Sequence, residues 1–185
     1  MKYDDATSDN TSKYTASVNN ASFTHDTSNN RYLVQKTTTG SSFNNSILVT
    51  GLSLDAPIEL SVDAMVSTSL TSSYQSEVGL LIKDSNTQLY GGFYTVANDK
   101  KLTLANTPTS RVTNGTVGLA INTWYHIVFT ITSSTVTVEI YNGETLVDSV
   151  THSNSYLSSN MSVGLAIQLA NQVSIYWKNL KVKPL

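Results

Sequence analysis

The segment Leu89 to Tyr94, with the sequence LYGGFY, combines three aromatic residues with two adjacent glycines. Tyr90, Gly92 and Tyr94 fall on one face of an extended strand, because successive side chains alternate between faces. Tyrosine rings stack on the C–H faces of pyranoses, while amides and carboxylates bond to the hydroxyls. With polar residues close in sequence and one tyrosine near the end of the chain, they form the predicted ligand site: Tyr90, Tyr94, Asn98, Asp99, Arg111 and Tyr176. The alternative is structural, since a glycine pair also suits a bend of a curved sheet against which tyrosines pack.

Carboxylates and histidines are the other candidates for chemistry, and neither group forms a catalytic pattern. Glu59 and Asp63 share the face of one expected strand, but no second glutamate follows, and three further glutamates are isolated: Glu77, Glu139 and Glu144. Glycoside hydrolysis needs two carboxyl groups about 5 to 9 Å apart. The chain has no Gly-X-Ser-X-Gly elbow, and its three histidines lack the spacing of a zinc site. We therefore predict that the chain is not an enzyme, with a glycoside hydrolase or lyase lacking the usual motif as the alternative.

The elements that must position these residues are clearest between Trp124 and Ser149. Apolar residues occupy every second position from Tyr125 to Ile131 and again from Val136 to Ile140. A period of two indicates strands with one buried face, so His126 points away from the core. Asn142-Gly143 suits a type I′ turn, in which both residues have positive φ, and Glu144 to Val150 then returns as a third strand. The segment predicts a β-meander.

Similar short segments recur along the rest of the chain, and none has helical spacing. Further strands are expected at 31–36, 46–50, 57–67, 77–84, 88–96, 101–105, 116–120, 162–170 and 174–182. With the meander they number about a dozen, which favours a two-sheet jelly roll over an immunoglobulin sandwich of seven to nine strands. We predict an all-β fold, a two-sheet antiparallel β-sandwich that forms a single domain over residues 1–185.

The composition excludes several classes of partner. Only 13% of the residues are charged and the formal net charge is −2, so the chain offers neither the basic stripe of nucleic-acid-binding proteins nor a cationic patch for a membrane surface. It has no run of 18 apolar residues, and we expect no membrane insertion. It has no cysteine, which rules out disulfides and thiolate metal sites. Its richness in Ser, Thr and Asn is typical of extracellular or cell-surface domains that belong to larger proteins or fibres.

Several segments together give the chain a family resemblance. They are the pair VGLLIKD and LYGGFY, the WYHIVFTI meander with its Asn-Gly hairpin, a polar start near Asp4-Asp5, and the closing VSIYWKNLKV. In this pattern the chain resembles the laminin-G, pentraxin and legume-lectin group of concanavalin A-like jelly-roll domains. The resemblance implies that Trp124 fills the edge of the core and that the closing strand lies beside the N-terminal one. Glycosidases of the same superfamily carry Glu-X-Asp-X-X-Glu on one strand, and that motif is missing here.

The resemblance also raises the question of calcium. Related sandwiches often hold a structural calcium ion where the terminal strands meet, with an aspartate from each end of the chain. Asp5 would be the first ligand, but the closing segment Trp177-Lys178-Asn179 has a lysine where the second carboxylate would stand. The positive charge of Lys178 would repel a calcium ion there, or Lys178 would take the place of the ion and form a salt bridge. We therefore expect no cofactor, with calcium at Asp5 as the alternative.

The resemblance and the missing catalytic motifs together favour a binding function. We expect a non-catalytic extracellular binding or adhesion module whose partner is a glycan or another cell-surface polymer. The alternative in the structural class is a spacer domain of an adhesin or phage tail fibre, without a small ligand.

Overall fold

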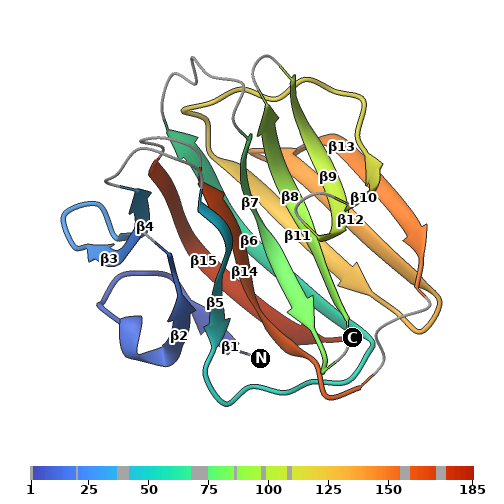
Figure 1. The fold of residues 1–185 in the computed structure, drawn as a ribbon, viewed down its shortest axis with the longest axis horizontal. Helices are drawn as coiled ribbons and strands as arrows, with labels where there is room; N and C mark the ends of the chain where they lie inside the picture. The colour runs from blue at the N-terminus through green and yellow to red at the C-terminus, as the bar shows by residue number, and fades with distance from the viewer. Residues whose placement is uncertain are drawn as a thin grey trace.

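A computed structural model describes residues 2–19, 21–36, 42–67, 75–85, 87–96, 99–107, 110–154, 159–169 and 174–185. These residues fold into two antiparallel sheets that pack face to face (Figure 1). Helical structure in this part of the chain is limited to a 3-10 turn, η1 (Thr11–Lys13), so no described helix is long enough to cross a membrane. The predicted all-β sandwich is confirmed.

The larger sheet has eight described strands and the smaller has seven. Across the larger sheet the order is β13 (Thr145–Ser153), β12 (Thr135–Asn142), β11 (Tyr125–Ile131), β6 (Ile58–Ser67), β15 (Ser174–Pro184), β4 (Arg31–Lys36) and β3 (Ala21–Asp26), and β1 (Lys2–Asp4) also pairs with β15. Across the smaller sheet it is β10 (Ser110–Asn114), β9 (Asp99–Thr107), β8 (Gln88–Val96), β7 (Gln75–Lys83), β14 (Ser162–Leu169), β5 (Ser42–Val49) and β2 (Tyr14–Ser17).

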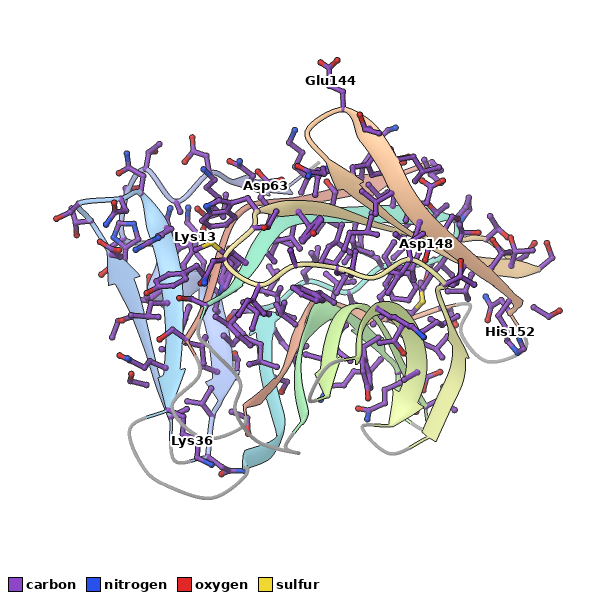
Figure 2. All side chains as sticks on the ribbon, turned by 90° about the horizontal axis from the view of Figure 1, so that it is seen from above. Lys13, Lys36, Asp63, Glu144, Asp148 and His152 are labelled. Carbon is purple, nitrogen blue, oxygen red and sulfur yellow. The ribbon has the colours of Figure 1, made fainter. Side chains whose placement is uncertain are left out.

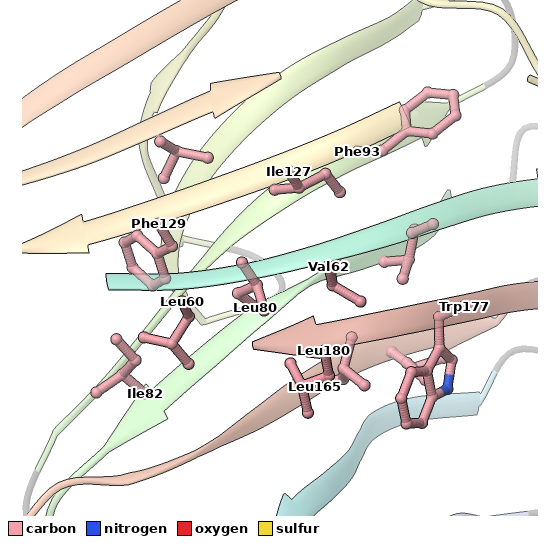
Figure 3. Close-up of a cluster of buried hydrophobic side chains, with 14 of the residues drawn as sticks. Leu60, Val62, Leu80, Ile82, Phe93, Ile127, Phe129, Leu165, Trp177 and Leu180 are labelled. Atoms are coloured by element: carbon pink, nitrogen blue, oxygen red, sulfur yellow. The ribbon is translucent and has the colours of Figure 1, made fainter. Parts of the chain in front are cut away.

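Alternation along the strands determines which side chains enter the core. In β11 the residues at odd positions from Tyr125 to Ile131 are buried, and those between them are half-buried. The side chains of the two sheets fill the space between them (Figure 2), and the close-up in Figure 3 shows Trp177, Phe93 and Phe129 among them. Each large apolar side chain that is fully buried contributes roughly 1.5 to 3 kcal/mol. The interior can therefore stabilise the sandwich without disulfides.

The aromatic residue of β11 that enters the core is Tyr125, and the expectation that Trp124 fills the core edge is wrong. Tyr125 is 5% exposed, and its ring meets Phe93 edge to face at a centroid distance of 5.6 Å. Trp124 is one position out of phase and half-buried, and the ammonium of Lys178 lies 4.8 Å from the centre of its ring. The core tryptophan is Trp177, whose side chain is fully buried.

The β12–β13 hairpin exists as predicted, but its turn differs from the prediction. Asn142 pairs with Thr145 as the last residue of β12, so the two turn residues are Gly143 and Glu144. Gly143 has a φ of 60°, and neither Asn142 nor Glu144 has a positive φ. A positive φ at the first turn residue alone belongs to a type II′ turn, not a type I′ turn. The turn projects beyond both sheets, with Glu144 at its tip (Figure 2).

The expected strand at Thr116–Ala120 is a loop in the structure. The backbone N–H groups of Thr116 and Val117 donate to one carboxylate oxygen of Asp148 in β13, at 2.7 and 2.9 Å. Because these donors bond to a side chain, they are not available to a neighbouring strand. The strand in this region lies earlier, as β10.

The N-terminal strand lies beside the closing strand, as the resemblance implied, with Asp4 opposite Leu180. Asp4 is 7% exposed, and its carboxylate accepts hydrogen bonds from the hydroxyls of Tyr14 at 2.8 Å and Tyr32 at 2.9 Å. Burial and the negative carboxylate raise the pKa of both tyrosines, so each remains a protonated donor. Tyr14 belongs to the smaller sheet and Tyr32 to the larger one. Asp4 therefore joins the two sheets.

Candidate functional site

The outer face of the smaller sheet, which is turned away from the core, carries most of the predicted ligand residues. The strand register places Tyr90 of β8 opposite Leu81 of β7 and Ala105 of β9. Ala105 is in turn opposite Arg111 of β10, at a point where the register of that pair shifts. Directly opposed residues of neighbouring strands share a face. Tyr90 and Arg111 thus occupy one cross-strand row.

A second row crosses the same strands nearer to the end of β8. Gln168 of β14 is opposite Glu77 of β7, Glu77 is opposite Tyr94 of β8, and Tyr94 is opposite Lys101 of β9. Tyr94 is an even number of residues from Tyr90 in the same strand, so both rows belong to the outer face. By residue type the second row offers an amide, a carboxylate, a phenol and an ammonium group, and of these four side chains the structure describes that of Lys101. These are the groups with which proteins bond to sugar hydroxyls and stack on sugar rings.

Small residues separate the two rows. Gly79 of β7 is opposite Gly92 of β8, and the same line continues over the neighbouring strands with Ser46, Ala166 and Thr103. Five strands at about 4.8 Å spacing make this strip about 19 Å long. The strip runs between the two rows.

The glycines of β7 and β8 are required because backbones approach one another closely. A Cβ atom on Gly79 would lie 2.6 Å from the carbonyl oxygen of Gly91, and one on Gly92 would collide with the backbone of Val78 and Gly79. A Cβ atom on Gly91 would collide with Val138 of the other sheet. At these glycines the close contacts are therefore between neighbouring strands and between the two sheets.

Tyr90 is not the exposed stacking residue that the sequence predicted. It is 3% exposed and packs against Leu81 and Ala105, with Leu48 and Ala166 at the edge of this small apolar cluster. On the outer face its side chain is therefore buried among these neighbours.

Three other predicted residues are placed by their backbone only. Tyr94, Asp99 and Arg111 lie in β8, β9 and β10, and their side chains lie outside the described part of the structure. Asp99 pairs with Val96 where β8 and β9 meet. Asn98 lies outside the described residues. The ligand role of all four stays a prediction.

Tyr176 lies on the opposite side of the sandwich from the other predicted residues. Its neighbours in β15, Ile175 and Trp177, are buried in the core, so Tyr176 belongs to the outer face of the larger sheet. The guanidinium of Arg31 lies 3.8 Å from the centre of its ring and is also paired with Asp26 at 2.8 Å. The structure does not bring Tyr176 together with Tyr90 and Tyr94.

A polar cluster on the outer face of the larger sheet was missed by the sequence analysis. Nδ1 of His126 lies 2.7 Å from Oδ1 of Asp63, and the amide of Asn179 donates to the other carboxylate oxygen at 2.5 Å. Burial disfavours the ionised form of Asp63, but the hydrogen bonds from His126 and Asn179 and the positive charge of Lys178 outweigh it. Together they hold the pKa of Asp63 below its ordinary value. Alternation could place Asp63 and His126 on outer faces, but it could not pair β6 with β11.

Asp5, the residue predicted for calcium, is engaged by its own loop. One carboxylate oxygen accepts hydrogen bonds from the backbone N–H of Thr7 at 3.0 Å and from its hydroxyl at 2.8 Å. These bonds to Thr7 lower the pKa of Asp5. Over the described ranges, no group of three or more His, Cys, Asp or Glu residues could hold a metal ion. Calcium at Asp5 and a salt bridge of Lys178 both stay predictions.

Comparison with solved structures identifies the fold. Lectin II from Ulex europaeus matches with a TM-score of 0.68 at 13% identity, over 94% of this chain and 93% of that one. The chain has the concanavalin A-like jelly-roll fold. The VIP36 exoplasmic/lumenal domain in its Ca²⁺/Man3GlcNAc-bound form shares this jelly roll, with a TM-score of 0.68 and 10% identity over 94% of this chain and 84% of that one. The carbohydrate-binding module CBM66 from Bacillus subtilis matches with a TM-score of 0.59 and 15% identity, over 91% and 94%.

The structural matches bear out the resemblance that the sequence segments indicated, although identity to these structures is only 10 to 15%. No protein-family model matches the sequence, and no curated protein matches it either.

Proposed function

We propose that this concanavalin A-like domain is a non-catalytic carbohydrate-binding module that acts outside the cell or in a lumenal compartment. The proteins that share its fold support the proposal. They include a lectin, a lumenal domain bound to Man3GlcNAc and a carbohydrate-binding module. The low share of charged residues also suits a ligand that is recognised through hydroxyl groups.

One observation carries the proposed site, namely the row of Gln168, Glu77, Tyr94 and Lys101 beside the strip of small residues. Small residues allow a sugar ring to approach the sheet, and the row supplies groups for the hydroxyls and one aromatic ring. Since Tyr90 is buried, Tyr94 is the stacking residue of this proposal. Arg111, Asp99 and Asn98 are proposed at the β9 side of the same face.

A glycan array of the whole chain, followed by titration calorimetry with the best ligand, tests the proposal. Tyr94→Ala should weaken binding roughly tenfold or more, as truncation of an aromatic anchor does. Glu77→Gln should weaken it as well, because a charged acceptor is replaced by a neutral one. Tyr176→Ala is the matched control, since it removes a tyrosine from the opposite face of the sandwich, and its binding should be unchanged.

The other outcomes each point to a different function. Failure to bind any glycan on the array would favour the structural spacer. Release of reducing ends from a bound polysaccharide would favour a hydrolase. Loss of binding on treatment with a chelator would show that calcium takes part.

A further inference from the structure

A cavity of about 310 Å³ lies between the two sheets, at the end of the sandwich where the chain begins. The strands that contribute to it, β1, β2, β5 and β15, lie together at this end (Figure 1). Its walls are mainly apolar and include Tyr14, Val49, Leu180 and Val182. A volume of this size is at the lower end of the range of about 300 to 1,000 Å³ found for small-molecule sites.

The cavity wall contains a buried negative charge. Asp4 lines the cavity and is 7% exposed. All four donors to its carboxylate are neutral: the hydroxyls of Tyr14 and Tyr32, the backbone N–H of Ala6 at 2.9 Å and the amide of Asn10 at 3.4 Å. Across the residues that the structure describes, Asp4 forms no ion pair. Hydrogen bonds satisfy its oxygens, and within the described part of the chain none of its hydrogen-bond partners is a cation.

Lys13 also lines the cavity. Its positive charge would attract an anion, whereas the carboxylate of Asp4 would attract a cation. The side chain of Lys13 is exposed, whereas Asp4 is buried. A charge acts roughly fourfold more strongly at an effective dielectric constant of about 20 than at the value of about 80 in water. The buried carboxylate therefore outweighs the exposed ammonium in its effect on a ligand inside the cavity.

We infer that this cavity binds a small organic ammonium ion with an apolar body. The ammonium group faces Asp4 and Tyr14, and the hydrocarbon part packs on Val49, Leu180 and Val182. This site is independent of the proposed glycan site, because it shares no residue with either row on the outer face of the smaller sheet.

Titration of the whole chain with three ligands of equal length, followed by two-dimensional NMR, tests the inference. The ligands are hexylammonium, hexanol and hexanoate, which differ in charge and share the same apolar chain. Hexylammonium should bind roughly tenfold more tightly than hexanol, because it adds attraction to a buried charge, and hexanoate should bind most weakly. The resonances of Val49, Leu180 and Val182 should shift in a saturable manner. Equal or tighter binding of hexanoate would overturn the inference, as would the absence of saturable shifts at millimolar concentrations.

Two variants separate this site from non-specific binding. Lys13→Gln removes a positive charge that repels the ammonium group of the ligand. It should strengthen hexylammonium binding several-fold. Val49→Phe fills the cavity and should abolish the binding of all three ligands. If Val49→Phe does not fold, Lys13→Glu replaces it, and this variant must bind hexylammonium more tightly than Lys13→Gln does. Unchanged affinity in Lys13→Gln, or full binding by a folded Val49→Phe, would overturn the inference.

Discussion

Gly143 is the residue of the β12–β13 hairpin whose backbone conformation limits the choice of amino acid. Its φ is 60°, and a Cβ atom built on it would have no neighbour within 4 Å. A side chain there would therefore be unfavourable because of the positive φ, and not because it collides with neighbouring atoms. Gly143→Ala should lower the free energy of unfolding by about 1 to 2 kcal/mol, measured by urea denaturation.

Gly118 provides the matched control for this turn. It also has open space around a built Cβ atom, and its φ lies outside the left-handed region. Gly118→Ala should leave stability nearly unchanged or raise it slightly. Equal losses in the two variants would mean that the turn at Gly143 has been described wrongly.

Asp63 should make the stability of the protein depend on pH. Its pKa is lower in the folded protein than in the unfolded chain, so the unfolded chain binds the proton more readily at acidic pH. The stabilisation is present above the unfolded pKa of about 3.9 and is lost as the pH falls through the folded pKa. Asp63→Asn should therefore destabilise the protein at pH 7 and do so less at acidic pH. Urea unfolding of both proteins at the two pH values measures this, with Glu144→Gln at the exposed turn as the control.

A destabilisation by Asp63→Asn that is equal at both pH values would contradict the lowered pKa of Asp63. It would indicate that the side chain contributes by packing alone.

At the scale of the strand, β8 combines two functions on its outer face. Tyr90 packs with Leu81 and Ala105, whereas Tyr94 belongs to the row proposed to bind glycan. Tyr90→Ala should therefore cost about 3 to 5 kcal/mol in unfolding free energy, as truncation of a buried aromatic residue does. Tyr176→Ala, at a half-buried tyrosine of β15, should cost less. A Tyr90→Ala variant that melts like the parent protein would show that Tyr90 is exposed after all.

Sequence patterns predict strands well where one face is buried and the alternation is long. Tyr125 to Ile131 is such a case, and its parity correctly places Tyr125 inside and His126 outside. Trp124 was assigned to the core by resemblance, against that same parity, and the alternation was right. Thr116–Ala120 was mistaken for a strand because the Asp148 carboxylate that binds its N–H groups comes from a distant part of the chain.

At the scale of the whole molecule, the jelly roll could be predicted from the number of alternating strands, but the pairing of distant strands could not. The contact of Asp63 with His126 depends on the β6–β11 pairing, and the burial of Tyr90 depends on its neighbours in β7 and β9. The face on which Tyr90 and Tyr94 lie follows from alternation alone. Which of the two is covered depends on packing, which no local pattern contains.

Asp4 acts at this largest scale, because its carboxylate connects β1 of the larger sheet to Tyr14 of the smaller sheet and Tyr32 of the larger one. Asp4→Ala would leave two tyrosine hydroxyls and the N–H of Ala6 without their acceptor. We expect a loss of about 2 to 5 kcal/mol in unfolding free energy, measured by urea denaturation at pH 7. Asp5→Ala removes the neighbouring carboxylate, which is bonded only to Thr7 and its own exposed loop, and it should change stability little. If Asp5→Ala lowered the free energy of unfolding more than Asp4→Ala, the contact between the two sheets at this end would depend on the loop after β1. It would not depend on the buried carboxylate of Asp4.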